Sequence, residues 1–304
     1  MQQAELTQLI QHTFGIAPTA VERMAFGHTS VTYKVDVEDQ QVIVRTNASP
    51  SAFSRTGANL ATLRKLGLPA PRLIAADLSL SRFDAAYLIL ESIPGRDLRF
   101  ELEGMTRQQQ HVLATQLVGF QRRVGSLPHG KGYGYAALGK DGPATSWLEV
   151  VESQLSDVTQ MTSPRLATFA RSVREALQVR VKEMPAVPAT CFLDDLTTKN
   201  VIVQDGVLQG VVDFDHVCYG DPLFWIALTS TAIVSDVGEA YLTYTEELCE
   251  SWGVDPLSAG ALALYTAVHC HRFLANRSEE GPVWLERMLT YGERQVTFAM
   301  DDAA

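Results

Sequence analysis

The sequence is poor in the features that mark disulfide-rich, membrane-spanning and nucleic-acid-binding proteins. Only 4 of its 304 residues are cysteine and none stands in a C-x-x-C spacing, which favours reduced thiols over a disulfide framework or a zinc site. The longest apolar stretch, residues 223–234, is interrupted by hydroxyl residues and is too short to span a bilayer. The formal net charge of −10 argues against nucleic-acid binding by phosphate neutralisation.

Three further patterns are absent or incomplete. Residues 1–15 lack a cationic segment and a continuous apolar run, so we expect no secretory signal and a cytoplasmic protein. Residues 128–144 are rich in Gly and Tyr but lack the G-x-x-x-x-G-K-[ST] pattern, which favours a structural loop over a phosphate cradle. His269 and His271 flank a cysteine, but adjacent helical residues point in different directions, so structural roles are favoured over a shared metal ion.

The composition is that of an ordinary globular protein. With 46% hydrophobic and 20% charged residues, a chain of 304 residues can bury a full core in one large or two moderate domains. The acidic balance is compatible with a cationic small substrate, although most acidic proteins are simply soluble. Neither disorder nor a fibrous repeat is indicated.

Hydrophobic periodicity predicts a β-rich region followed by a helical one. The fold class is therefore α+β, with a small antiparallel sheet and one inserted helix in residues 1–92 and a mainly helical region in residues 93–304. Residues 91–95 (ESIPG) form the connector. The expected strands are 21–26, 30–37, 41–46, 72–76 and 86–90, and the expected helices are 5–14, 51–66, 106–124, 145–159, 164–183, 221–233, 237–252, 258–275 and 282–299.

Residues 191–223 carry the pattern with the clearest chemical meaning. Asp195 and Asn200 stand in a D-x-x-x-x-N spacing, and Asp213 follows two β-branched runs joined by an Asp205-Gly206 turn. In phosphoryl transfer the first Asp orients an attacking hydroxyl, while the Asn and the later Asp hold magnesium. The spacing alone would occur about once by chance in a chain this long, so its context decides. The hairpin is expected to carry Asn200 and Asp213 toward the same end.

The ordered set of motifs resembles the aminoglycoside phosphotransferase and choline-kinase-like family. Its hallmark, H-G-D-x-x-x-x-N followed by I-D-F/W and G-D-P, corresponds to residues 193–200 (LDDLTTKN), 212–214 (VDF) and 220–222 (GDP). The segments 68–71 (LPAP) and 88–95 (LILESIPG) also fit the family, and the resemblance covers nearly the whole chain. It implies a two-lobed, protein-kinase-like fold.

The resemblance also implies an activity and the residues that carry it. The protein would be an ATP- and Mg²⁺-dependent phosphotransferase that moves the γ-phosphate to a hydroxyl of a small molecule, with GTP left open as the donor. Asp195 would orient or deprotonate the hydroxyl, Asn200 and Asp213 would ligate magnesium, and Arg45 would pair with the phosphates. The remaining nucleotide-binding positions would be Gly27, Thr29 and Ser30 over the phosphates and the backbone near Glu91 and Ile93 for adenine.

The chain departs from the family pattern at several positions. Leu193 and Asp194 replace the His and Gly before the catalytic Asp. Asn59 falls where the helix acid that pairs with Arg45 would stand, so another acid, or none, would hold that arginine. Trp225 stands where many relatives have an acidic residue. These departures indicate a divergent enzyme or, alternatively, a pseudokinase that binds nucleotide or a small ligand without transfer.

Two charged residues near the motifs, Lys199 and Asp215, have open roles. Lys199 would reach a phosphate or lie at the surface, and Asp215 would support the metal site or face solvent. The resemblance implies that Asp221 is a scaffold residue bonded to the catalytic-loop backbone. A protein kinase is disfavoured because no activation loop follows Asp213.

The acceptor and the oligomeric state are left open. An aminoglycoside or another amine-bearing sugar and a metabolic alcohol are equal candidates. The first would suit acidic residues if they line the cleft: Asp194, Glu246, Glu247, Glu250, Glu279 and Glu280.

Overall fold

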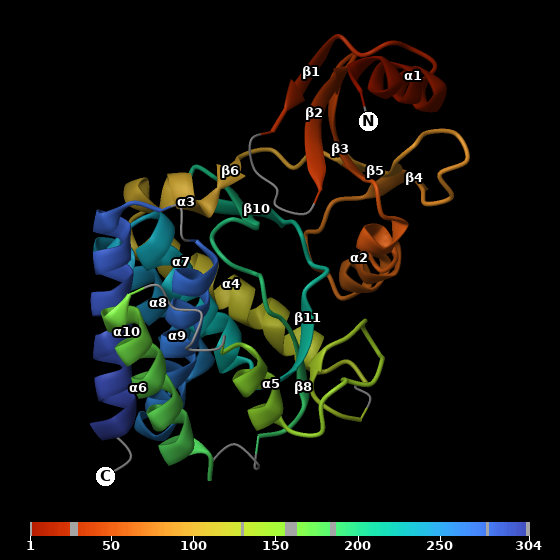
Figure 1. The fold of residues 1–304 in the computed structure, drawn as a ribbon. Coiled ribbons are helices and arrows are strands. Elements are labelled where there is room, and N and C mark those ends of the chain that lie inside the picture. Colours follow the sequence, from red (N-terminus) through yellow and green to blue (C-terminus); the bar gives the residue numbers. More distant parts are fainter. Residues whose placement is uncertain are drawn as a thin grey trace. The chain divides into compact units, whose positions relative to one another are not determined.

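The computed structural model describes residues 2–24, 30–128, 131–155, 163–182, 187–277 and 280–301. Its contacts divide the chain into two compact units, shown in Figure 1. The sheet unit comprises residues 1–95 and 209–215, and the helical unit comprises residues 96–208 and 216–304. Among the described residues, no helix is both long and apolar enough to cross a membrane.

The sheet unit is built on a five-stranded sheet of order β1-β2-β3-β5-β4. All of its pairings are antiparallel, as the sequence predicted. The strands are β1 (Ala20–Arg23), β2 (Val31–Val37), β3 (Gln40–Asn47), β4 (Leu73–Asp77) and β5 (Ala86–Glu91).

Alternation along the central strands gives the sheet one apolar face. Val35, Val42 and Val44 are fully or almost fully buried there, against Leu6 and Leu9 of the helix α1 (Gln3–Phe14). Burying one such side chain contributes about 1.5–3 kcal/mol, so the α1 face is a substantial part of this core. Because successive strand residues point to opposite faces, the residue after Val44 lies on the other face of β3. That residue is Arg45.

The helix predicted over residues 51–66 is divided in the structure. A 3₁₀ turn, η1 (Pro50–Phe53), comes first, and the α-helix α2 (Thr56–Lys65) follows. The hydroxyl of Ser54 bonds the carbonyl of Ser51 at 2.9 Å, which offers the backbone an alternative to a continuous helix. The break determines which residues α2 presents on each of its faces.

The helical unit contains most of the α-helices and two small sheets of order β10-β9-β6 and β7-β11-β8. Strand β10 continues into the sheet unit. The elements are β6 (Arg96–Asp97), α3 (Leu98–Glu101), η2 (Leu102–Gly104), α4 (Arg107–Gly125), β7 (Gly134–Tyr135), α5 (Trp147–Ser153), α6 (Pro164–Arg180), β8 (Thr190–Leu193), β9 (Val201–Gln204), β10 (Val207–Val211), β11 (Val217–Gly220), α7 (Leu223–Asp236), η5 (Glu239–Tyr241), α8 (Thr243–Trp252), α9 (Pro256–Asn276) and α10 (Pro282–Asp301).

Helix α7 forms the centre of the helical unit. Every residue from Leu223 to Ser235 is buried, as expected for a helix that is apolar on all sides and enclosed by other elements. Helices α8, α9 and α10 contact it, and Figure 1 shows α9 and α10 beside α6. Because α7 starts directly after the G-D-P motif, that motif is joined to the most buried helix of the unit.

Three local predictions in this unit were incomplete. The helix expected over residues 145–159 corresponds to α5, which ends at Ser153, and residues 156–159 lie outside the described residues. The helix expected over residues 237–252 is interrupted at Gly238, whose φ of 137° is incompatible with a helix, and α8 begins only at Thr243. The loop expected over residues 128–144 contains β7, whose Tyr135 pairs with Cys218 of β11. A two-residue strand that depends on so distant a partner has no local signal in the sequence.

Candidate active site

The catalytic-loop segment, residues 194–200, lies between β8 and β9. Strand β9, which follows the segment, ends in a turn to β10, where Asp205 and Gly206 have φ values of 54° and 74°. Two consecutive positive φ values are those of a type I′ hairpin turn, as the D-G pair predicted. The side-chain amide of Gln109 on α4 donates to the Asp205 carbonyl at 3.2 Å and anchors the turn to that helix.

Asp195 and Asn200 are brought together inside the helical unit. The Asn200 side-chain amide donates to the Asp195 carbonyl at 2.7 Å, and its main-chain N–H donates to the Thr197 carbonyl at 3.0 Å. The Thr197 hydroxyl donates to the Asp195 carboxylate at 3.3 Å. The D-x-x-x-x-N spacing therefore closes one hydrogen-bonded turn. The amide nitrogen of Asn200 takes the inward bond of this turn.

Neighbouring elements hold the carbonyls of this turn from outside. The indole N–H of Trp225 on α7 donates to the Leu196 carbonyl at 2.6 Å. The main-chain N–H of Arg99 on α3 donates to the Thr198 carbonyl at 3.3 Å. Trp225, noted in the sequence as a departure from the family pattern, thus has a defined role as a buried donor to the loop.

Gln121 supplies a support that sequence reasoning missed. Its side chain is 1% exposed on α4, accepts from the Leu193 N–H at 3.0 Å and donates to the Leu193 carbonyl at 2.8 Å. A primary amide satisfies both main-chain groups at once, which no apolar residue does. The strand that leads into the loop is therefore held through its backbone, although Leu193 has no polar side chain. Its position on the apolar face of the predicted helix, between Leu117 and Val124, was the only signal in the sequence.

Asp221 has structural contacts, but its partners are not the predicted ones. Its carboxylate accepts from the main-chain N–H of Leu223 and from the hydroxyl of Tyr265, both at 3.0 Å, and not from the catalytic loop. Burial raises the pKa of Asp221, and these two hydrogen bonds partly offset the rise. Asp221 therefore secures the start of α7, while Trp225 makes the bond to the loop.

Asp194, the carboxylate next to Asp195, lies in the interior. It is 3% exposed and accepts from the Tyr135 hydroxyl at 2.6 Å. Burial raises its pKa, an effect that the charge of Arg272 and the Tyr135 bond oppose. Its other carboxylate oxygen has no hydrogen-bond partner among the described residues. Asp194 thus links the loop to β7.

Lys199 is paired within the protein. Its ammonium lies 3.0 Å from the carboxylate of Asp236, the last residue of α7, and Arg277 binds the other oxygen of Asp236 at 2.9 Å. Burial pushes the pKa of Asp236 up, but Lys199, the hydroxyl of Ser235 and Arg277 outweigh it and lower the pKa. The residue before Asn200 is therefore tied to the end of the central helix.

Replacing Lys199 by Met should loosen the loop beside Asn200. Asp236 keeps Arg277, so we expect a loss of only about 1–2 kcal/mol in the free energy of unfolding. Urea denaturation measures this effect. Lys131→Met is the control because Lys131 is exposed in the same unit. A free energy of unfolding for Lys199→Met equal to that of wild type would contradict this role for the ion pair.

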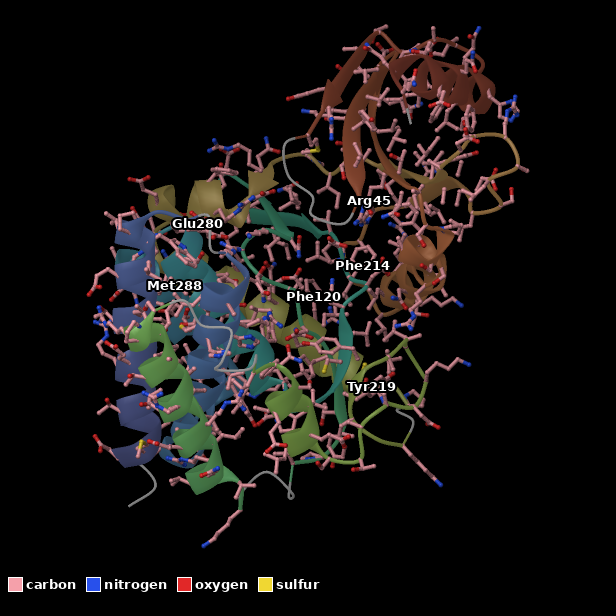
Figure 2. The ribbon with its side chains drawn as sticks, in the orientation of Figure 1. Arg45, Phe120, Phe214, Tyr219, Glu280 and Met288 are labelled. Carbon is pink, nitrogen blue, oxygen red and sulfur yellow. The ribbon has the colours of Figure 1, made fainter. Side chains whose placement is uncertain are left out.

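In the sheet unit the structure brings Arg45 and Asp213 together. Their side chains form an ion pair of 3.1 Å, with Arg45 16% and Asp213 38% exposed. Asp213 has φ 53°, an uncommon value for a residue other than Gly and one that recurs at functional sites. Phe214 is 5% exposed and anchors the segment; it is labelled with Arg45 in Figure 2. The acid that holds Arg45 is thus Asp213.

Asp215 is bonded to α2. It accepts from the Thr56 hydroxyl at 2.5 Å and from the Asn59 amide at 3.1 Å. Burial raises its pKa, as does the charge of Asp213, while the two hydrogen bonds and Arg45 oppose the rise. Asn59, at the position where the helix acid was expected, therefore binds a carboxylate and not an arginine.

The other predicted nucleotide-binding positions are only partly described. Gly27 and Thr29 lie outside the described residues. Ser30 accepts a hydrogen bond from Asn47 at 3.2 Å at the start of β2. The main-chain N–H of Glu91 donates a hydrogen bond to the Arg72 carbonyl at 2.9 Å. Ile93 packs beside Gly210, where a side chain would clash with its methyl groups.

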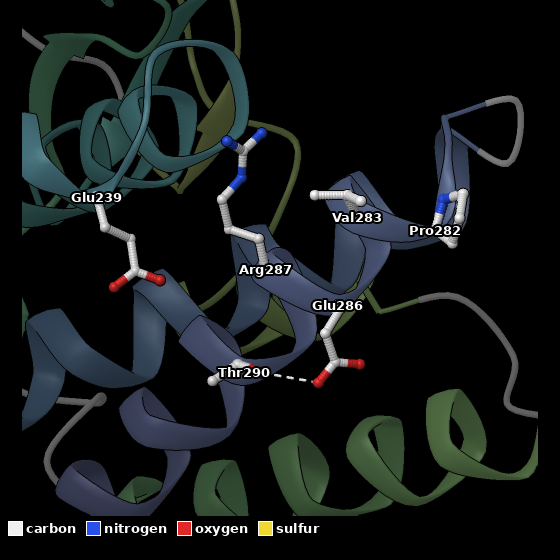
Figure 3. Close-up of a pocket in the computed structure, with 6 residues that line it drawn as sticks. All are labelled: Glu239, Pro282, Val283, Glu286, Arg287 and Thr290. Carbon is white, nitrogen blue, oxygen red and sulfur yellow. Dashed lines mark hydrogen bonds between the residues drawn. The ribbon is translucent and has the colours of Figure 1, made fainter.

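Two other polar features lie away from these motifs. A pocket of about 490 Å³ opens on α10 and η5 (Figure 3), but the carboxylates that line it are paired with arginines: Glu239 with Arg294 and Glu286 with Arg165. On α4 and α8, ligand atoms of His111, Glu247 and Glu250 lie within 4.8 Å of one another. Glu247 is already bound there, by the guanidinium of Arg107 at 2.6 Å and by the ring nitrogen of His111 at 2.8 Å.

Comparison with known proteins decides the family. The model of the "Phosphotransferase enzyme family" matches residues 21–256, well over half of the chain. The chain belongs to this family. It is a phosphotransferase enzyme, and the resemblance seen in the motifs is confirmed. A search of curated proteins found no match.

Solved structures share the fold of this phosphotransferase over nearly its whole length. A thermostable mutant of aminoglycoside phosphotransferase APH(4)-Ia, in a ternary complex with AMP-PNP and hygromycin B, has a TM-score of 0.70 and 16% identity, with 97% of this chain and 98% of that chain covered. The GDP and kanamycin complex of APH(2″)-IIIa has a TM-score of 0.69 and 14% identity, with 96% and 98% covered. A candidate fructosamine-3-kinase from Haemophilus somnus has a TM-score of 0.64 and 15% identity, with 95% and 96% covered. At these identities the likeness establishes the protein-kinase-like fold.

Proposed function

We propose that this phosphotransferase transfers the γ-phosphate of ATP, with Mg²⁺, to a hydroxyl of a small molecule. The observation that carries the proposal is the closed turn of the catalytic loop, in which Asn200 bonds the Asp195 carbonyl at 2.7 Å. This turn fixes, within one loop, a carboxylate suited to the acceptor hydroxyl and an amide oxygen suited to a cation.

Asp195 orients the acceptor hydroxyl and takes up its proton as the oxygen attacks the phosphorus. No covalent enzyme intermediate is required, because phosphoryl transfer depends mainly on positioning and on electrostatic neutralisation. The bonds from Trp225 and Arg99 to the loop carbonyls keep the Asp195 backbone in place. The proposed mechanism therefore requires a rigid loop, and these hydrogen bonds restrain the loop.

The proposed magnesium ligands fit the chemistry of that ion. Asn200 offers an amide oxygen and Asp213 a carboxylate, and Mg²⁺ prefers such hard oxygen donors. Held by these residues, Mg²⁺ would supply positive charge that neutralises the negative charge of the nucleotide phosphates. Arg45 carries the fork of donors that suits phosphate, so we propose that it pairs with the nucleotide. In the structure its charge is balanced by Asp213.

The nucleotide is proposed to lie along the sheet unit. Gly27, Thr29 and Ser30 would cover the phosphates, and main-chain groups of Glu91 and Ile93 would bind the base. Because the Glu91 N–H is already donated to Arg72, its carbonyl is the more suitable partner for adenine. The structural neighbours include complexes with AMP-PNP and with GDP, so competition between ATP and GTP is the experiment that identifies the preferred base.

The acceptor is proposed to be a small molecule that carries a hydroxyl and an amine. The net charge of −10 favours cations, and two structural neighbours were solved with the aminoglycosides hygromycin B and kanamycin. A metabolic amino alcohol or an amine-bearing sugar meets the same requirement. The free cysteines, three of them buried, support a reducing and hence cytoplasmic location.

An acceptor screen tests the proposed function. We expect ATP- and Mg²⁺-dependent release of ADP that rises with one class among aminoglycosides, macrolides, amino alcohols and sugars, measured by a coupled assay. Chelation of the metal with EDTA should abolish the signal, and Asp195→Asn serves as the inactive control. Acceptor-dependent ADP release that persists equally in the Asp195→Asn variant would contradict the assignment.

A further inference from the structure

Helix α2 meets the segment 213–215 through one acidic side chain. Asp215 accepts from the Thr56 hydroxyl at 2.5 Å and from the Asn59 amide at 3.1 Å. Both donors are nearly inaccessible to solvent, with Thr56 2% and Asn59 1% exposed. Two hydrogen bonds from buried donors to one half-buried carboxylate form a specific connection, because losing the carboxylate would leave buried polar groups unsatisfied.

In this connection the acid and its partner are exchanged relative to the usual kinase arrangement. There the helix supplies the acid, which pairs with the basic residue of the strand. Here α2 supplies neutral donors, and both acids belong to the segment 213–215. Arg45 pairs with Asp213 at 3.1 Å, and the charges of Arg45 and Asp213 both act on the Asp215 carboxyl.

We propose that Asp215 is a positioning residue, which joins α2 to the nucleotide-facing pair Arg45–Asp213 in place of a helix acid. Asp213 is held on one side by Arg45 and is fixed two residues further on by the Asp215 bonds, with buried Phe214 between. The inference rests on the proposed function, because Asp213 and Arg45 matter to substrate only if the protein binds ATP with magnesium.

Because the acids here belong to the segment 213–215, adding an acid to α2 should weaken nucleotide binding, although the family pattern has an acid on this helix. Asn59→Glu restores an acid on the helix, yet here the new carboxylate faces Asp215 in a buried site. We expect the Kd for ATP with Mg²⁺ to rise about tenfold, and KM for ATP to rise more than kcat falls, because the two carboxylates repel each other and displace the segment that carries Asp213. Adding Asp215→Asn should return the Kd to within about threefold of wild type, since an amide at position 215 can donate to the carboxylate introduced on α2.

Calorimetry with ATP and Mg²⁺, together with the melting temperature of each free variant, tests the proposal. Gln41→Glu is the matched control for stability, because Gln41 donates to Asp36 at 2.7 Å in the same unit and the change sets a carboxylate against a carboxylate. If Asn59→Glu does not fold, Asp215→Asn alone should still weaken ATP binding.

The outcomes separate this inference from the proposed function. Tenfold weaker binding in Asn59→Glu and recovery in the double variant support it. Wild-type ATP affinity in Asn59→Glu, or no recovery on adding Asp215→Asn, overturns the positioning role while the proposed function stands. A wild-type protein that does not bind ATP with Mg²⁺ overturns the proposed function, and the inference falls with it.

Discussion

Replacing Asp195 by Asn should lower kcat by about 10²- to 10⁴-fold while the affinity for ATP stays close to that of wild type. An amide keeps the size of the side chain and its place in the turn, but it cannot take up the proton of the acceptor hydroxyl. The catalytic loop should persist, because its bonds from Asn200, Trp225 and Arg99 all end on backbone carbonyls.

The measurement combines steady-state rates with calorimetric ATP binding. Asp205→Asn is the matched control, since Asp205 is exposed in the neighbouring turn and Asn tolerates its φ of 54°. Loss of ATP affinity with unchanged turnover in Asp195→Asn would refute the catalytic assignment. A wild-type rate no higher than that of Asp195→Asn would favour the alternative of a nucleotide-binding pseudokinase.

Replacing Asp213 by Asn should remove the magnesium dependence of ATP binding. The change deletes the only formal charge among the two proposed metal ligands and frees Arg45 from its ion pair. The backbone should not be strained, because Asn accepts the φ of 53° found at this position. Turnover should also fall by orders of magnitude, because the metal would no longer neutralise charge on the phosphates.

Thermal shift with ATP, with and without Mg²⁺, measures this effect. A ligand at 100 times its Kd stabilises a protein by about 2.7 kcal/mol, enough for a clear rise in melting temperature. We expect Mg²⁺ to enlarge the ATP-induced shift in wild type and in the exposed control Asp39→Asn, but not in Asp213→Asn. An equal magnesium-dependent shift in Asp213→Asn would show that the metal is held elsewhere.

The sequence predicted those parts of the structure that depend on local patterns. Apolar alternation placed the strands of the sheet unit, and the D-G pair predicted the turn at Asp205 and Gly206. The family pattern, more than any single spacing, selected Asp195 and Asn200, and the structure shows them in one turn. Their roles stay predictions until variants are measured.

The partners of the catalytic loop were beyond sequence reasoning, because they are separated widely along the chain. Gln121 stands 72 positions from Leu193, and Trp225 stands 29 positions from Leu196. Neither residue type by itself predicts such a hydrogen bond. A glutamine on a helix is usually solvated, and a tryptophan in an apolar run usually contributes by burying its large apolar surface. The folded topology alone brings these donors to the loop.

The bonds of Asp215 show the same limit at closer range. The pattern of α2 was predicted as part of one longer helix, and the 3₁₀ turn that precedes it shifts the helix start to Thr56. A helix face depends on where the helix begins, so the pairing of Thr56 and Asn59 with Asp215 could not be derived from spacing. What the sequence did indicate was an anomaly at Asn59.

The most direct test of the account is the fate of the γ-phosphate. ATP labelled in that group should be incubated with wild-type enzyme, Mg²⁺ and the acceptors that stimulate ADP release, and the products separated. We expect the label in a phosphorylated acceptor, equimolar with ADP, and none with Asp195→Asn. Label recovered only as inorganic phosphate or as intact ATP, across every acceptor class, would contradict a phosphotransferase that acts on a small-molecule hydroxyl.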